Sequence, residues 1–268
     1  MSALTLLANT DCHINAGCAF PAPGLHSFQF KPLFTVGGVE FNKPSLIAVV
    51  SMVIVVGFFW AAFNKPKLVP GKLQLIGEIG YQFVARSIAT EVIGRKGKQY
   101  VPFLMSIFFF VWIMNIMAIV PLAQFPSTSH FAYPVALAAL VFVTYMFLTF
   151  KTHGFRGGVK NLVWISGLPK PLVPLMVLLE FIQNVISRPF TLAVRLWANM
   201  FAGHMLIVMF SIAAWYLVTP SFLAVAAGGS FLLAVGMTAF EVLIQFLQAY
   251  IFTLLAAIYI SGALEEAH

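Results

Sequence analysis

The sequence predicts an all-α polytopic membrane protein with about five membrane-crossing helices and one amphipathic helix at the cytoplasmic surface. Apolar residues make up 61% of the chain and charged residues only 9%, whereas soluble domains carry about 25% charged residues. The mean hydropathy is +0.95. The long apolar runs also lack the alternation and spacing typical of barrel strands. These observations exclude a soluble fold and favour a helical bundle.

The distribution of basic residues predicts the orientation in the membrane. The net charge is +7, but the stretches 123–131 and 218–229 contain no Lys or Arg. This alternation follows the positive-inside rule, so the N-terminus is expected outside and the C-terminus in the cytoplasm. The excess of charge therefore reports topology and does not indicate nucleic-acid binding. The two basic connections contain Lys65, Lys67, Lys72, Arg86, Arg95, Lys96 and Lys98, and then Lys151, Arg156, Lys160 and Lys170.

Residues 1–43 are predicted to form an extracytoplasmic tail, because they are rich in Gly, Pro and Phe and have no helical period. Residues 1–10 lack a basic region and have too short an apolar core for a signal peptide. Cys12 and Cys18 lie in this tail, where a disulfide is allowed but not required. Together with His13 they form an incomplete metal-ligand set, so no metal site is expected.

Residues 44–268 are predicted to form a single membrane domain. The amphipathic surface helix is expected over about 70–99, where apolar and charged residues alternate at helical spacing. The five membrane spans are expected at about 44–63, 101–122, 131–150, 171–218 and 222–264.

The last two apolar stretches are much longer than the roughly 20 residues that cross a bilayer upright. Each therefore either breaks into two short spans or forms one helix far from the membrane normal. Neither contains a second strong break, and Pro189 requires only a kink. Five crossings from an outside N-terminus also place the C-terminus inside. We therefore expect two long, strongly tilted helices that form a hairpin.

Arg195 is the most informative residue of the chain. It lies about 20 residues from either end of its apolar stretch, or roughly 30 Å along a helix. A guanidinium at membrane depth costs at least a few kcal/mol and does not lose its charge. At this distance from the helix ends its side chain cannot reach the headgroups. Arg195 must therefore face a watery cavity or an anion of a partner.

Polar residues form one stripe on each of the two long helices. Such stripes often serve only to hold two helices together through polar contacts. The presence of an Arg and a Glu favours a functional site instead. The stripe of the first helix consists of Asn184, Arg188, Thr191, Arg195 and Asn199, and that of the second consists of Thr238, Glu241, Gln245 and Gln248.

Glu241 and His204 are candidates for proton transfer. A carboxylate and an imidazole at membrane depth are typical of a proton path, although a static buried ion pair is the alternative. Glu180, near the inner end of the first long helix, lines an aqueous exit or lies at the membrane interface. Arg188 is also nearer the inside and is able to reach the headgroups.

Two motifs lie on the last two apolar stretches. The first is Arg-Leu-x-x-Asn-Met-x-Ala-Gly at 195–203, preceded by Arg188-Pro189. The second is Leu-Gln-Ala-Tyr-Ile-Phe at 247–252, with Tyr259 after it. Both resemble motifs of the a subunit of the proton-translocating, bacterial-type F-type ATP synthase, and Asn115 followed by Pro121 is a weaker match. The resemblance covers most of the chain from the first span onward.

The resemblance implies a role for several residues. Arg195 falls at the family's essential arginine, Asn199 beside it, and Gln248 at the glutamine that faces that arginine from the last helix. His204 and Glu241 fall at two coupled channel positions, in the exchanged order compared with well-known bacterial relatives. Five further residues are weaker candidates for the site, and three positions differ from the family pattern. The candidates are Glu180, Gln245, Arg188, Thr191 and Asn184, and the departures are Trp197, Ala198 and Ala118.

The implied function is that of a proton-conducting stator in the bacterial plasma (inner) membrane. Two offset aqueous half-channels would deliver protons to and from c-subunit carboxylates, and Arg195 would prevent a direct proton leak. The implied partners are the c-subunit ring, b-type peripheral stalk subunits, the remaining ATP synthase subunits and membrane lipids. No nucleic acid, cofactor or metal is expected. The chain has no Gly-Lys-Ser/Thr phosphate loop, so it is expected to be non-catalytic by itself.

Two other functions are compatible with charges at the membrane midplane. An ion-coupled secondary transporter usually shows internal repeats and broken Gly/Pro-rich helices, and no repeat is visible here. A purely structural membrane anchor has no need of Arg195 or Glu241. Within the favoured function, proton is preferred over sodium, because neither stripe offers a cluster of oxygen ligands.

Overall fold

The computed structural model describes residues 14, 20–21, 24, 34–36, 39–121, 123–163, 173–219 and 222–264. Cys12 and Cys18, and the question of their disulfide, lie outside these residues. The chain divides into two compact units. Unit 1 consists of Met1–Met52, Ile113–His130 and Ala198–Leu247, and unit 2 consists of Val53–Trp112, Phe131–Trp197 and Gln248–His268.

The predicted fold class is confirmed. The described residues contain five helical stretches that are long and apolar enough to cross a membrane, so the protein is a multi-pass helical membrane protein. A short antiparallel hairpin, β1 (Phe34–Val36) and β2 (Val39–Phe41), is a small addition that the sequence did not predict. The five stretches are Lys43–Phe63, Lys72–Ile116, Ala132–Lys160, Val173–Tyr216 and Leu223–Leu264.

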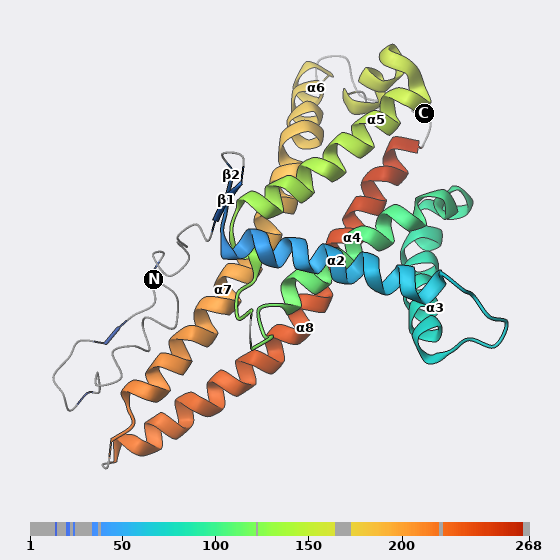
Figure 1. Cartoon of the computed structure of the whole chain (residues 1–268). Coiled ribbons are helices and arrows are strands. Elements are labelled where there is room, and N and C mark those ends of the chain that lie inside the picture. The colour runs from blue at the N-terminus through green and yellow to red at the C-terminus, as the bar shows by residue number, and fades with distance from the viewer. Residues whose placement is uncertain are drawn as a thin grey trace. The chain divides into compact units, whose positions relative to one another are not determined.

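Unit 1 is built around the last two helices. α7 (Arg188–Tyr216) and α8 (Leu223–Leu264) follow each other in the chain, and within unit 1 they run antiparallel, side by side, in Figure 1. Unit 1 contains the second half of α7 and the first half of α8. Its other main parts are the start of α2 (Lys43–Phe63) and the connection that includes η5 (Ser127–Ser129).

Buried polar contacts fix the connection 113–130 within unit 1. The Thr128 hydroxyl donates to Asn115 Oδ1 at 2.7 Å, and the Ser127 hydroxyl donates to the carbonyl of Pro44 at 2.8 Å. The same unit contains an apolar cluster of Ile47 and Phe125. A helix that ends in water would leave such groups exposed, so this connection is part of the packed interior.

The region predicted as a surface helix, 70–99, is a helical segment of unit 2. It consists of α3 (Lys72–Val84), the π-helix η3 (Ala85–Ile93) and the 3-10 helix η4 (Gly94–Tyr100), and α4 (Val101–Ile116) follows. α3 packs closely on its neighbours, because a Cβ on Gly80 would lie 2.7 Å from the Phe109 ring of α4.

α3 holds one polar side chain inward. Gln74 is buried, and its side-chain amide forms hydrogen bonds with the backbone of Lys67 and with Glu78. Apolar residues of the same segment are both exposed and buried: Leu75 and Ile79 are 47% and 59% exposed, and Ile88 of η3 is 0% exposed.

Two helices end at residues other than the predicted ones. α4 ends at Ile116 and not near 122, because tight turns begin there and Pro121 cannot continue a helix. α5 (Ala132–Val163) continues past 150 into the region predicted as a basic loop. Gly154 interrupts it with a φ of 67°, a conformation that glycine adopts readily.

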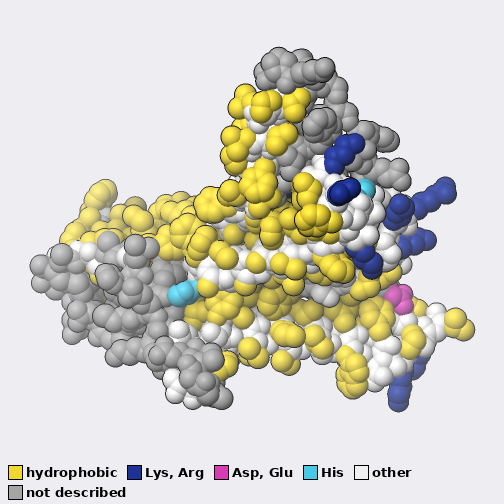
Figure 2. Space-filling view, turned by 90° about the horizontal axis from the view of Figure 1, so that it is seen from above, with side chains coloured by type: hydrophobic (Ala, Val, Ile, Leu, Met, Phe, Trp, Pro, Cys, Tyr) yellow, Lys and Arg dark blue, Asp and Glu magenta, His cyan; other side chains and the backbone are white. Residues whose placement is uncertain are grey.

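The basic residues stay on the surface although part of their region is helical. Lys65, Lys72, Arg95, Lys151 and Arg156 are all exposed and all belong to unit 2. Figure 2 shows Lys and Arg side chains gathered at one edge of the visible face, beside a surface that is mostly apolar. On this face the cations of the basic connections therefore lie apart from the mostly apolar surface.

The predicted kink near Pro189 takes the form of a π-helix. α6 (Val173–Phe181) leads into η7 (Ile182–Ser187), and α7 begins at Arg188. Proline lacks an N–H and its ring clashes with the carbonyl four residues earlier, so the preceding turn widens. α6 also packs against α5 within unit 2, as Figure 1 shows.

Candidate functional site

Arg195 lies on the exposed surface of α7. It occupies the middle of the apolar helical stretch Val173–Tyr216, as the sequence predicted. Thr191 and Asn199, one turn before and after it, are exposed as well. Leu192 and Leu196, each one residue after an exposed member of the stripe, are 1% and 0% exposed. Thr191, Arg195 and Asn199 are therefore on an exposed face of α7, whereas Asn184 at the start of the stripe is buried.

No ion pair joins Arg195 to a carboxylate among the residues that the structure describes. Its guanidinium does interact electrostatically with the Tyr259 hydroxyl of α8, which belongs to the same unit. A fixed cation with no anion within the described chain is available to an anion from outside it. This is the condition that the sequence placed on Arg195.

The stripe on α8 is mostly buried, in contrast to Thr191, Arg195 and Asn199 of α7. Glu241, Gln245 and Gln248 are 3%, 0% and 2% exposed. They follow one another at spacings of four and three residues and therefore share one face of α8. Both carboxylate oxygens of Glu241 are buried without a hydrogen-bond partner among the described residues. A carboxylate in such surroundings is costly to keep charged, which is typical of a group that exchanges protons.

Gly203 of α7 and Glu241 of α8 face each other within unit 1. A Cβ on Gly203 would lie 3.3 Å from Oε1 and 3.4 Å from Cδ of Glu241. The small residues 202–203 at the end of the α7 stripe thus leave space for the carboxylate. His204, the next residue, is half-buried.

His204 has an apolar neighbour and a cation near it. Its ring lies edge-on to the ring of Phe125, with the centroids 5.8 Å apart. Lys43, at the start of α2, acts on His204 electrostatically. All three residues belong to unit 1. Neither Phe125 nor Lys43 was a candidate from the sequence, because nothing in the apolar pattern links positions so far apart.

A second polar group lies in unit 2, near the start of α7. The Asn184 side-chain amide donates to the carbonyl of Leu162 at 2.7 Å and to Glu180 Oε2 at 3.0 Å. Asn184 is 5% exposed, and the hydroxyl of Tyr145 on α5 donates to its backbone carbonyl. Two of the lower-ranked candidates, Glu180 and Asn184, are therefore in direct contact.

Arg188 joins this group through an aromatic ring. Its guanidinium carbon lies 5.2 Å from the centroid of the Tyr259 ring, a cation–π arrangement. Tyr259 in turn lies 5.7 Å from the ring of Tyr145. The Thr191 hydroxyl donates to the carbonyls of Ser187 and Arg188 in the preceding helical turn. Arg188 thus contacts the aromatic ring of another helix and is half-buried.

Sequence reasoning missed Tyr145 as a member of this polar group. It lies in a continuous apolar run, and its position in α5 carries no spacing signal. Tyr259 was noted only as part of a motif. Trp197, a departure from the expected pattern, packs edge-on against Phe131 with the ring centroids 5.6 Å apart.

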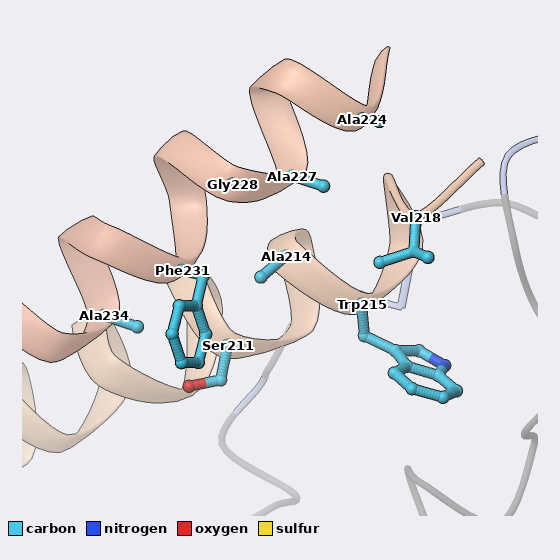
Figure 3. Close-up of a pocket in the computed structure, with 9 residues that line it drawn as sticks. All are labelled: Ser211, Ala214, Trp215, Val218, Ala224, Ala227, Gly228, Phe231 and Ala234. Atoms are coloured by element: carbon cyan, nitrogen blue, oxygen red, sulfur yellow. The ribbon is translucent and has the colours of Figure 1, made fainter. Parts of the chain in front are cut away.

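A cavity of ≈ 530 Å³ lies between the end of α7 and the start of α8 in unit 1. Figure 3 shows that its lining is made of apolar side chains and Ser211, whose hydroxyl donates to the carbonyl of Ile207. No candidate site residue lines it. The described residues also contain no group of three or more His, Cys, Asp or Glu side chains that could hold a metal ion.

Comparisons with known proteins give a consistent result. The family model described as "ATP synthase A chain" matches residues 45–261. The chain is 54% identical to "ATP synthase subunit a" of Streptomyces lividans over 266 residues, which cover 98% of this chain and 94% of the relative. It is 38% identical to "ATP synthase subunit a" of a Nocardioides species, over 94% of this chain and 96% of the relative.

Proposed function

Since the chain belongs to the ATP synthase subunit a family, we propose that it is the proton-conducting stator subunit of the membrane sector. Its role in proton transport for ATP synthesis follows from the family. The finer proposal is that two offset aqueous half-channels carry protons to and from carboxylates on a rotating ring of c subunits. The chain itself would carry out no ATP chemistry.

Arg195 is the observation on which the proposal rests. A carboxylate that enters apolar surroundings prefers to be protonated, and beside a fixed guanidinium it prefers to be charged. Arg195, exposed in the middle of an apolar helix, would discharge each arriving carboxylate. Its positive charge would also prevent a proton from crossing directly from one half-channel to the other.

The candidates of unit 1 are proposed to line the outer half-channel. Glu241, with its buried carboxylate against Gly203, and the neighbouring His204 would exchange protons there. Gln245 lies on the same buried face of α8 and would keep the path polar. Asn199 would lie at its inner end, five residues before His204.

The candidates of unit 2 are proposed to line the inner half-channel. Glu180 is half-buried and accepts a hydrogen bond from Asn184, so the two side chains form a polar exit. The exposed cations of unit 2 would lie at the cytoplasmic surface. With that orientation the N-terminal tail would lie outside a bacterial plasma membrane. The c ring, b-type stalk subunits and lipids would be the immediate partners.

The proposal is tested by replacing Arg195 in the assembled complex. In inverted membrane vesicles, Arg195→Ala should abolish ATP-driven acidification while the subunit still copurifies with the complex. Each proton that crosses 100 mV releases about 2.3 kcal/mol, so even a small leak past residue 195 would dissipate the gradient. Arg156→Ala, at an exposed cation of α5, is the matched control and should pump normally.

Two results would contradict the proposal. One is normal coupled pumping by Arg195→Ala, since the essential cation would then be elsewhere. The other is a purified native complex that contains this chain without c subunits. A transporter or an anchor predicts the second result, whereas the synthase function requires copurification of the ring and of a soluble ATPase head.

A further inference from the structure

The helix that carries Arg195 is preceded by the π-helix η7, whose last turn meets a proline. In a π-helix each N–H bonds to the carbonyl five residues earlier, and the N–H of Arg188 bonds to the carbonyl of Gln183. The next N–H in this series would come from residue 189, which is proline and has none. The carbonyl of Asn184 therefore receives no π-type hydrogen bond from its own helix.

Tyr145 of α5 supplies a donor to this carbonyl. Its hydroxyl donates to the Asn184 carbonyl, and the two residues are only 2% and 5% exposed. Its ring is fixed by Phe142 and Tyr259, with centroid distances of 5.4 and 5.7 Å. A buried carbonyl without a partner is costly, so this hydrogen bond stabilises the wide turn at the point where Pro189 interrupts it.

The wide turn determines which way α7 faces. A π-type turn contains one residue more than an α-turn, and one residue corresponds to a rotation of about 100°. If η7 closed to an α-helix, everything after it would rotate by that amount relative to α6. The faces of α7 are sharply different, because Thr191 and Arg195 are exposed and Leu192 and Leu196 are buried.

We infer that Tyr145 is a positioning residue for Arg195. Its hydroxyl satisfies the carbonyl that Pro189 leaves open, holds η7 in its π form and thereby directs the Arg195 side chain to the exposed face of α7. The consequence for pumping rests on the proposed function of Arg195. The rotation of α7 does not depend on that function, and cysteine labelling measures it separately.

The experiment combines pumping with cysteine labelling in the assembled complex. Cys12 and Cys18 are replaced by Ser, and Thr191→Cys or Leu192→Cys is introduced with and without Tyr145→Phe. Membrane-permeant maleimide should label position 191 in preference to 192, and Tyr145→Phe should shift labelling towards 192. In a background without introduced cysteines, Tyr145→Phe should lower ATP-driven pumping on the order of tenfold through the misplaced cation.

Pro189→Ala provides a second variant that tests the cause. It restores an N–H at residue 189, which makes an external donor unnecessary. Tyr145→Phe should therefore change neither labelling nor pumping further in the Pro189→Ala background. Tyr81→Phe, the same chemical change at an exposed position of α3, is the control and should leave both readouts unaltered.

The outcomes separate the two proposals. Unchanged labelling in Tyr145→Phe would overturn the positioning role, whatever happens to pumping. An equal loss of pumping on Tyr145→Phe in the native and Pro189→Ala backgrounds would overturn the positioning role as well. If labelling shifts but Arg195→Ala pumps normally, the positioning of α7 stands and the proposed function of Arg195 fails.

Discussion

Gly203 and Glu241 lie against each other across the α7–α8 pair, with the carboxylate oxygen 3.3 Å from the position that a Cβ on the glycine would occupy. The contact brings together a small residue at the end of one polar stripe and the acid of the other. It means that the size of residue 203 determines the position of the Glu241 side chain.

Gly203→Val should therefore impair proton pumping. The added isopropyl group, a Cβ and two methyl groups, has no space beside Oε1 of Glu241, so the carboxylate must move. Misplacement by about 1 Å costs on the order of 100-fold in rate. ATP-driven acidification of inverted vesicles measures the effect. Gly57→Val on α2 is the control, since a Cβ there meets nothing within 4 Å. Equal pumping by the two variants would show that the contact has no functional weight.

Glu241→Gln should remove a proton carrier while keeping the shape of the side chain. A positioned acid or base typically contributes 10²–10⁴-fold to proton transfer, so pumping should fall by about 100-fold or more with normal assembly. Glu78→Gln on α3 is the matched control, because that carboxylate only accepts a hydrogen bond from Gln74. If Glu241→Gln retained full pumping, the buried acid would be structural.

Thr128→Val should destabilise unit 1 without touching the proposed proton path. The Thr128 hydroxyl donates to Asn115 Oδ1, and both residues are 0% exposed. A buried acceptor left without its donor costs about 1–3 kcal/mol. Chemical denaturation in mixed micelles measures the free energy of unfolding. Thr144→Val should cost much less, because that hydroxyl only donates to the carbonyl of Leu140 in its own helix.

Tyr259→Leu should lower the thermal stability of the complex, and Tyr259→Phe should not. The Tyr259 ring lies beneath the Arg188 guanidinium at 5.2 Å, an interaction worth about 0.5–2 kcal/mol. Phe retains the aromatic face and Leu does not. Comparing the melting temperatures of the two variants separates the ring from its hydroxyl, and a similar loss in both would assign the stabilisation to the hydroxyl.

The main elements and the central residue could be predicted from the sequence because their signals are local. Length and hydropathy predicted the five apolar helices, and spacing along α8 predicted that Glu241, Gln245 and Gln248 share a face. A charge in the middle of an apolar run predicted the special position of Arg195. Each of these inferences uses residues within a few turns of each other.

The remaining features depend on contacts that the sequence does not reveal. Tyr145 lies 39 residues from Asn184, and nothing in its apolar surroundings indicates the hydrogen bond. The extension of α5 past Gly154 was missed because two further glycines suggested a loop. In the structure Gly158 allows close contact with Phe150, where a Cβ would lie 2.7 Å from its ring. Packing there overrides the low helix propensity of glycine.

The unequal burial of the two stripes has a genetic consequence. The acid and amides of α8 are enclosed by this polypeptide itself, so suppressors of a defect at Glu241 should arise at positions such as 203 of the same gene. Arg195 faces outward from its own chain. Second-site revertants of a conservative change at residue 195 should therefore be found in the gene of whatever subunit presents the opposing anion.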